Sequence, residues 1–208
     1  FQIDIRSEKS CDDGLIEIIK KFGKIDVLIN NAAIDAKFDN SLNQTHLSRF
    51  ENFPIQKVID SVEVNLTGTI RITQKVCKIM LKQKAGNIIN VASTYSLVSP
   101  NQNLYDFGSK NRQYKPVDYV ASKSFIPNFT RYLATFYSRD GIRVNAIVPH
   151  GIFNNHSQNF LKNWEKLSPI GRMCNVDELN GPFIFLASDA SSYMTGSTLI
   201  YDGGWTAW

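Results

Sequence analysis

The stretch GNIINVAS at residues 86–93 combines the features that decide the fold. Gly86 interrupts a long helical pattern that begins at Pro54, where proline suits the first turn of a helix. Asn87–Val91 is then a short apolar run, typical of a strand buried on both faces of a parallel sheet. Ser93 follows directly, so we expect its hydroxyl at the carboxyl end of this strand, where ligands bind in such sheets.

The same alternation of helical and strand patterns continues on both sides of this stretch. Helices are predicted over 7–22, 54–84, 117–138 and 176–188, and strands over 26–30, 87–91, 142–148 and 197–201. Phe1–Ile5 is interpreted as the end of a further strand, and Pro127 should bend its helix. The alternation predicts an α/β fold, a Rossmann-like doubly wound parallel sheet flanked by helices, in one domain over 1–208.

Composition narrows the class of protein. Apolar residues make up 43% of the chain and charged residues 20%, and the basic residues behind the net charge of +4 are scattered, which predicts no nucleic-acid partner. Neither a signal peptide nor an apolar run near 18 residues occurs, so no membrane partner is predicted. Cys11, Cys77 and Cys174 lack metal-ligand spacing, so we expect a reduced, cytoplasmic protein without a metal site.

Tyr119 and Lys123 form the pair in YVASK that suggests catalysis. Four residues apart in a predicted helix, they share one helix face. A tyrosine with a free pKa of about 10 is a poor acid or base at neutral pH, but a neighbouring ammonium favours the phenolate. The pair could thus act as a general acid/base, with Ser93 binding a substrate carbonyl. Taken singly, the pair also fits a solvated helix face, and Ser93 an ordinary turn.

Several segments, in order along the chain, resemble motifs of the short-chain dehydrogenase/reductase family, in its compact one-domain branch. They are NNAA (30–33), VNLTG (64–68), NVAS (90–93), YVASK (119–123), IRVNAIVPHG (142–151), FLASDASSYMTG (185–196) and YDGGW (201–205). Taken with the long segment between Ser93 and Tyr119, PHGIFNN (149–155) and the DGGWTAW ending (202–208) also resemble a group of oxidoreductases associated with flagellin and surface-sugar modification.

The resemblance implies roles for individual residues. Tyr119 would exchange the substrate proton, Lys123 would hold the nicotinamide ribose, Ser93 would orient the reacting oxygen, and Asn65 would support a water-linked proton relay. It also implies a bound NAD or NADP. Besides Tyr119 and Lys123, the implied cofactor-binding residues are Asp4, Ile5, Asn31, Ala32, Ala33, Pro149, Gly151 and Ile152. Helix packing for Asn65 and a strand-end cap for Asp4 are the plainer alternatives.

The chain departs from the family pattern in its first residues, in the length of one segment and at two positions that are usually glycine. Its first 30 residues contain no glycine-rich phosphate loop, and the chain opens at what resembles the third strand. We therefore expect a natural protein with an N-terminal βαβα portion of about 60 further residues, at about 30 per βαβ unit. The residue that selects NAD or NADP belongs to that portion, so both cofactors stay open. Ala33 and His150 stand where the family usually has glycine.

The segment between Ser93 and Tyr119 is longer than usual in the compact branch. The two residues are 26 positions apart, and the extra stretch, about 96–116, is rich in rings and cations. These residues are Tyr95, Tyr105, Phe107, Tyr114, Lys110, Arg112 and Lys115. Rings and cations together suit a sugar that bears an anion. We predict that the stretch walls the substrate pocket, with Tyr95, Arg112 and His150 as substrate contacts. A solvated surface loop is the alternative.

The leading hypothesis is an NAD(P)-dependent enzyme that interconverts an alcohol and a carbonyl on a small molecule, a sugar or nucleotide-sugar derivative. The alternatives are a nucleotide-sugar epimerase or dehydratase of the extended branch, and a catalytically silent cofactor-binding scaffold. Only 85 residues follow Lys123, too few for the separate substrate domain of the extended branch. Apolar residues recur on the helices over 54–84 and 117–138, which predicts a homodimer or homotetramer.

Overall fold

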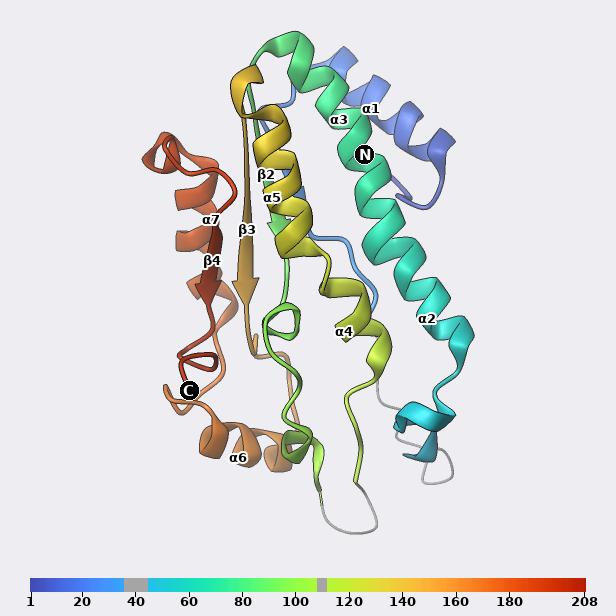
Figure 1. Cartoon of the computed structure of the whole chain (residues 1–208), viewed down its shortest axis with the longest axis vertical. Coiled ribbons are helices and arrows are strands. Elements are labelled where there is room, and N and C mark those ends of the chain that lie inside the picture. The colour runs from blue at the N-terminus through green and yellow to red at the C-terminus, as the bar shows by residue number, and fades with distance from the viewer. Residues whose placement is uncertain (36–44, 108–111) are drawn as a thin grey trace.

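A four-stranded parallel sheet forms the centre of the molecule (Figure 1). The computed structural model describes residues 1–35, 45–107 and 112–208. The strands lie in the order β1-β2-β3-β4 and pair in parallel throughout. Their bounds are β1 Val27–Asn30, β2 Gly86–Val91, β3 Ile142–Pro149 and β4 Thr198–Tyr201. Because all four strands pair in parallel, their carboxyl ends lie at the same edge of the sheet, toward which the arrowheads of β3 and β4 point in Figure 1.

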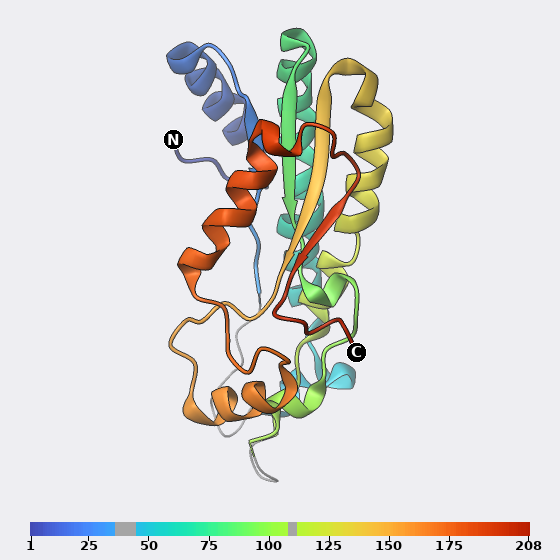
Figure 2. The ribbon, with the colours of Figure 1, turned by 90° about the vertical axis from the view of Figure 1, so that its left-hand side faces the viewer.

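Helices cover both faces of this sheet (Figure 2). Ile88 of β2 packs toward α3 and α5, whereas the next residue, Ile89, packs toward Leu186 of α7. Successive side chains of a strand point to opposite faces, so these contacts place α7 across the sheet from α3 and α5. The helices are α1 Glu8–Phe22, α2 Ile55–Val62, α3 Thr69–Gln83, α4 Val117–Lys123, α5 Ile126–Tyr137, α6 Gln158–Leu167 and α7 Asn180–Ala187. The predicted doubly wound α/β fold is confirmed.

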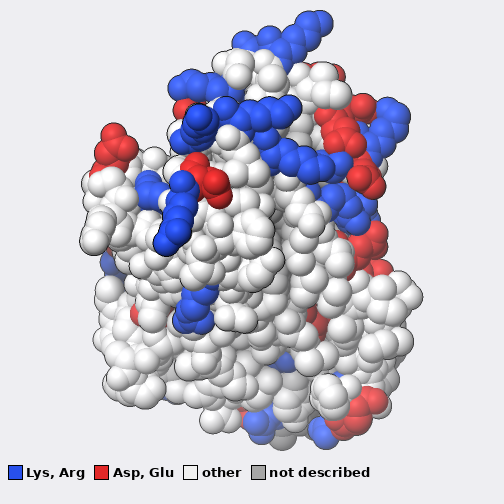
Figure 3. Space-filling view, turned by 45° about the horizontal axis from the view of Figure 1, so that its top comes forward, with Lys and Arg blue, Asp and Glu red and all other residues white. Residues whose placement is uncertain are grey.

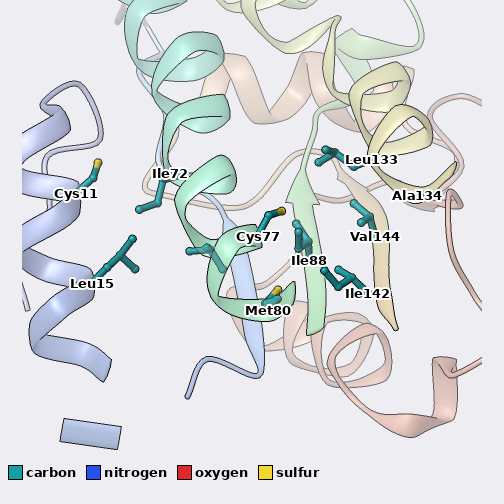
Figure 4. Close-up of a cluster of buried hydrophobic side chains, with 11 residues drawn as sticks. Cys11, Leu15, Ile72, Cys77, Met80, Ile88, Leu133, Ala134, Ile142 and Val144 are labelled. Carbon is teal, nitrogen blue, oxygen red and sulfur yellow. The ribbon is translucent and has the colours of Figure 1, made fainter. Parts of the chain in front are cut away.

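The largest apolar cluster lies between the sheet and the helices α1, α3 and α5 (Figure 4). Met80 of α3, Ile88 of β2 and Val144 of β3 are completely buried there. Leu15 of α1 extends the cluster away from the sheet, against α3. Fully burying side chains of this size stabilises a fold by about 1.5–3 kcal/mol each. This cluster makes the sheet and its helices a rigid support for the loops at the strand ends.

Two of the predicted helices are interrupted. The helix expected over 117–138 consists of α4 and α5, and Pro127 lies in the first turn of α5, where its missing N–H costs nothing. The helix expected over 54–84 consists of α2 and α3, joined by a π-helical turn at Glu63–Gly68. Such π-turns are frequent at functional sites, and this one contains Asn65.

Phe1–Ile5, predicted to end a strand, forms no strand in this structure. Residues 1–5 pair with no strand in the described part of the chain. The side chain of Ile3 instead covers Gly14 of α1, and that of Ile5 covers Gly68 at the end of the π-helical turn. The apolar pattern that suggested a strand thus reflects burial against helices.

Lysine and arginine side chains gather at the upper end of the face shown in Figure 3, with acidic side chains among them. This is the end opposite to the carboxyl ends of the strands. Among the described residues, no helix is long and apolar enough to cross a membrane.

Candidate active site

Ser93 and Tyr119 come together at the carboxyl edge of the sheet. Ser93 lies two residues beyond β2, is 6% exposed, and caps a short 3₁₀ turn by accepting a hydrogen bond from the N–H of Tyr95. Tyr119 lies in α4, and a hydrogen bond with the Ser93 hydroxyl lowers the pKa of its phenol. Two hydroxyls that converge in this way can hold one substrate oxygen between them.

The Tyr119 phenol is nevertheless held in its protonated form. Burial, together with the carboxylate of Asp35, raises its pKa to about 12, and the hydrogen bond with Ser93 only partly opposes this rise. A general acid/base works best with a pKa near the operating pH. Additional positive charge close to the phenol is therefore needed before Tyr119 can act as a base.

Lys123 supplies one such charge. Its side chain is 3% exposed, its Nζ atom lies 5.9 Å from the centroid of the Tyr119 ring, and it donates a 2.7 Å hydrogen bond to the carbonyl oxygen of Val91. Burial lowers the pKa of Lys123 to about 8, while Asp35 raises it slightly. Near neutral pH the ammonium thus persists beside the phenol.

Asn65 ties the loop after β1 to helix α4. Its amide donates to the carbonyl oxygen of Ile34 and to the hydroxyl of Ser122, both at 2.8 Å, and its carbonyl accepts from the N–H of Ile34 at 2.7 Å. Asn65 is 1% exposed, so these contacts are shielded from water. These hydrogen bonds hold the loop after β1 against α4, and none of them reaches Tyr119 or Lys123.

A buried polar ladder next to the site was not anticipated. Asn30 at the end of β1 donates to Asn90 of β2 and to Thr73 of α3, both at 2.8 Å, and Asn90 donates to Thr130 of α5 at 2.9 Å. The signal in the sequence was an asparagine inside each of two apolar strands. The ladder fixes β1 and β2 to both helices and so sets the position of the loops that follow them.

The residues expected to bind the adenosine half of a dinucleotide lie in two places. Asn31, Ala32 and Ala33 are exposed directly after β1, where small side chains let a ligand approach the backbone. Asp4 is exposed and paired with Arg6 at 2.8 Å, and hydrogen bonds from Arg6 lower its pKa to about 2. Ile5 is half-buried against the π-helical turn. The exposed carboxylate at the one place and the small residues after β1 at the other each suit contact with a nucleoside.

The residues expected on the nicotinamide side follow β3. Gly151 adopts a left-handed conformation with φ of 60°, and the Trp164 ring covers it so closely that no Cβ would fit. Ile152 pairs with Cys174 through an isolated β-bridge. With Pro149 at the end of β3, this turn meets the Ser93 loop at the carboxyl edge, so the residues present fit a nicotinamide ring next to Tyr119.

His150 lies next to the loop that carries Ser93, in an aromatic cluster. Its ring is 7% exposed and lies 4.6 Å from the ring of Trp164 and 4.4 Å from that of Trp205. Its Nδ1 atom is hydrogen-bonded at 2.5 Å to the hydroxyl of Thr94, which follows Ser93. Burial lowers the pKa of His150 to about 4, so the ring is neutral. Sequence reasoning missed Thr94 and both tryptophans, because nothing local marks their contact with His150.

The long segment after Ser93 turns two tyrosines into the site. The hydroxyls of Tyr95 and Tyr105 are hydrogen-bonded at 2.7 Å, and both residues are buried. Burial raises the pKa of Tyr95 to about 12 and raises that of Tyr105 as well. Tyr95 also meets the His150 ring edge-on at 5.7 Å. The rings of Tyr95 and Tyr105 thus pack between the loop that follows Ser93 and the turn that carries His150.

The cations of this segment differ in position. Arg112 lies at the surface, 3.4 Å from Asp106, with its guanidinium over the ring of Tyr114. Lys115, in contrast, reaches Tyr119, with its Nζ atom 4.7 Å from the ring centroid, and pairs with Asp35. Lys110 lies outside the described residues. Sequence reasoning grouped Lys115 with the other cations and gave Asp35 no role.

Comparison with known proteins finds similar sequences over nearly the whole chain. The model of a family described as enoyl-(acyl carrier protein) reductase matches residues 1–206. A 3-oxoacyl-[acyl-carrier-protein] reductase from Synechocystis is 33% identical over 208 residues, covering 98% of this chain and 74% of that protein. The post-translational flagellin modification protein A from Campylobacter coli is 28% identical over 205 residues, covering 99% of this chain and 77% of that protein.

Solved structures extend the comparison to three dimensions. A short chain dehydrogenase from Leptospira borgpetersenii with bound NAD⁺ superposes with a TM-score of 0.86 and 33% identity, covering 99% of this chain and 74% of that one. A gluconate 5-dehydrogenase from Burkholderia cenocepacia with NADP and tartrate gives a TM-score of 0.83 and 27% identity, covering 99% and 74%. With the motifs and the fold in agreement, the chain belongs to the short-chain dehydrogenase/reductase family.

Proposed function

We propose that this protein is an NAD(P)-dependent oxidoreductase that interconverts an alcohol and a carbonyl on a polyhydroxylated small molecule. The observation that carries the proposal is the convergence of Ser93 and Tyr119, with the Lys123 ammonium beside the phenol, at the carboxyl edge of the sheet. A scaffold without chemistry would have no use for this arrangement, which includes an ammonium that is costly to bury.

The chemistry divides between the cofactor and the chain. A bound nicotinamide supplies the hydride acceptor or donor. Tyr119 takes the hydroxyl proton when the alcohol is oxidised and returns it when the carbonyl is reduced. Ser93 donates a hydrogen bond to the same substrate oxygen and keeps it in line with the phenol. Lys123 stabilises the phenolate that forms when Tyr119 has lost its proton.

Relatives support the substrate class and leave the cofactor open between NAD and NADP. Among them are a D-threitol dehydrogenase, a 2-dehydro-3-deoxy-D-gluconate 5-dehydrogenase and an L-rhamnose 1-dehydrogenase, at 28–31% identity. The similar solved structures contain NAD⁺ in one case and NADP in another. A sugar, sugar acid or polyol is therefore the first class to test.

A second candidate is reduction of a 3-oxoacyl thioester. Two 3-oxoacyl-[acyl-carrier-protein] reductases are 33% and 32% identical, and the matching family model is named after a related reductase. The same Ser93–Tyr119 arrangement would protonate the 3-oxo group. Acetoacetyl-coenzyme A as a test substrate separates this activity from polyol oxidation.

The experiment that tests the proposal is a substrate screen with each cofactor. The purified full-length protein is mixed with NAD⁺ or NADP⁺ and sugars, sugar acids or polyols, and with NADH or NADPH and acetoacetyl-coenzyme A. The change in reduced nicotinamide is followed. Ser93→Ala should lower turnover about a hundredfold or more, whereas Ser192→Ala, at an exposed serine, should not. No turnover in either direction with either cofactor would contradict the proposal.

The outer faces of two helices suggest self-association. The ring centroids of Tyr132 and Phe136 in α5 lie 5.9 Å apart, and the two residues are 59% and 60% exposed. Leu81 of α3 is 38% exposed. Exposed apolar surface of this kind favours a two-fold contact with a second copy. We propose a homodimer or homotetramer. Light scattering should show wild-type oligomers and a smaller species after Tyr132→Asp with Phe136→Asp.

The state of the thiols supports a proposal for the compartment. Cys11, Cys77 and Cys174 are all free, and Cys77 is buried beside α5, where its pKa is raised to about 11. Three unpaired thiols suit a reducing compartment, and we place the protein in the cytoplasm. Fractionation of the native cells tests this placement.

A further inference from the structure

Lys115 forms a buried cationic position against the ring of Tyr119. Its Nζ atom lies 4.7 Å from the centroid of the Tyr119 ring and 5.9 Å from that of Tyr95. Both distances are within the range of a cation–π interaction. The side chain is only 7% exposed. The lysine therefore presents its charge to the face of the ring whose hydroxyl carries out proton transfer.

A carboxylate already occupies the position next to this charge. Lys115 donates to both oxygens of Asp35, at 2.6 and 2.8 Å. An ammonium so removed from water needs an anion beside it, because an uncompensated buried charge is strongly destabilising. The Asp35 side chain is 49% exposed, and its loop is held by the two hydrogen bonds between Asn65 and Ile34. The lysine is thus enclosed, while its partner borders solvent.

We propose that Lys115 binds a carboxylate of the substrate and that Asp35 holds this position until the substrate arrives. The inference rests on the proposed oxidoreductase function and narrows its substrates to hydroxy acids and their keto acids. The carboxylate would sit over the face of the Tyr119 ring, and the reacting oxygen would meet the phenol hydroxyl a few carbon atoms away. Asp35 shows that a planar anion with two oxygens fits against Lys115.

Arg112 is less suited to this task. Its guanidinium is turned toward Asp106 and the ring of Tyr114, and its side chain is 41% exposed. Lys123, the other buried cation near Tyr119, is committed to the carbonyl oxygen of Val91. Of these three cations, Lys115 alone combines burial, contact with the Tyr119 ring and a carboxylate partner.

The test compares sugar acids with polyols of the same carbon skeleton. The probes are threonate with threitol, arabinonate with arabinitol, and gluconate with glucitol. Calorimetry gives each dissociation constant in the presence of NAD⁺ and of NADP⁺, and reduced nicotinamide is followed separately. Wild-type protein should bind at least one acid more tightly than its polyol. Lys115→Met should weaken binding of that acid about tenfold to a hundredfold and change polyol binding less than about threefold.

For Asp35→Asn we expect the opposite change in affinity for the acid. The variant removes the competing carboxylate and keeps Lys115, so the acid should bind about threefold to tenfold more tightly, and its polyol should be unaffected. Lys115→Arg should retain the preference for the acid. Lys20→Met, at an exposed lysine of α1 far from α4, is the matched control and should change nothing. The melting temperature of each variant shows whether it is folded.

Different results would contradict the carboxylate site at Lys115 and the oxidoreductase function. The carboxylate site is wrong if no acid binds more tightly than its polyol, if Lys115→Met weakens both members of a pair equally, or if Asp35→Asn weakens the acid. Should Lys115→Met fail to fold, Asp35→Asn and Lys115→Arg still decide the matter. The oxidoreductase function is tested separately by turnover, so charge-dependent binding without any reduced nicotinamide would remove the function and leave the site.

Discussion

The ammonium of Lys123 is hydrogen-bonded at 2.7 Å to the carbonyl oxygen of Val91, the last residue of strand β2. Ser93 follows Val91 by two residues, and Tyr119 precedes Lys123 by one helical turn. One bond between a helix and a strand end therefore sets the distance between the serine and the tyrosine. Lys123 is in this way both the charge beside the phenol and the clamp that holds α4 against β2.

Removing the phenol hydroxyl should abolish catalysis and spare cofactor binding. In Tyr119→Phe the ring remains in place, but the proton has no carrier, and a general acid/base contributes about 10²–10⁴-fold in rate. We expect turnover on a confirmed substrate to fall by that factor, with NADH binding, followed by fluorescence titration, changed little. Tyr132→Phe, on the exposed face of α5, is the control. Wild-type turnover in Tyr119→Phe would rule out this mechanism.

Replacing Lys123 by methionine should remove activity without lowering stability at neutral pH. The folded pKa of about 8 lies below the ordinary 10.5, so at pH 7 the buried ammonium costs the fold about 3 kcal/mol. Its bond to Val91 offsets part of this cost. The wild type should gain stability relative to Lys123→Met as pH rises from about 8 to 10.5, because the folded state has lost the proton that the unfolded state still binds.

Denaturant titrations at several pH values measure this difference. Lys82→Met, at an exposed lysine of α3, should show no such pH dependence. A constant stability difference between Lys123→Met and the wild type from pH 7 to 10.5 would show that Lys123 titrates normally in the folded protein.

His150 should make the fold sensitive to acid. Its folded pKa of about 4 lies below the ordinary 6.5, so the neutral ring is favoured in the folded state. The stability from this group is fully present above pH 6.5 and is lost as pH falls toward 4, to a total of about 3 kcal/mol. His150→Asn, whose amide can still bond Thr94, should lose less stability over that range. His156→Asn serves as the control, since His156 is less buried than His150. Its ring stacks on Phe160, contacts Phe153 and accepts a hydrogen bond from the N–H of Asn154.

Gly151 should tolerate no side chain. An added Cβ would collide with the ring of Trp164, and the φ of 60° is unfavourable for alanine in any case. Gly171 has a similar φ of 72° but open space around it. We expect Gly171→Ala to cost about 1 kcal/mol and Gly151→Ala about 3 kcal/mol or more, measured by denaturant unfolding. Equal costs would show that Trp164 can move aside.

The sequence by itself determined the class of fold and the candidates for chemistry. The strands β1 to β4 and most helix ends follow from local pattern, because a buried parallel strand requires a short apolar run and a helix requires recurring apolar positions. Ser7 and Gly23 at the ends of α1 are examples of this local determination, since each acts on the backbone beside it. The YVASK and NVAS motifs likewise identified Tyr119, Lys123 and Ser93 by residue type and spacing.

The tertiary structure alone decided which distant side chains meet. Asp35 and Lys115 are 80 positions apart, and His150 and Thr94 are 56 apart, yet each pair is hydrogen-bonded. Residues 1–5 satisfy the pattern of a strand but pack on helices instead. Periodicity indicates whether a side chain is buried, but it does not indicate which residue the side chain packs against. Burial depends on the local pattern, whereas the packing partner depends on how whole elements pack.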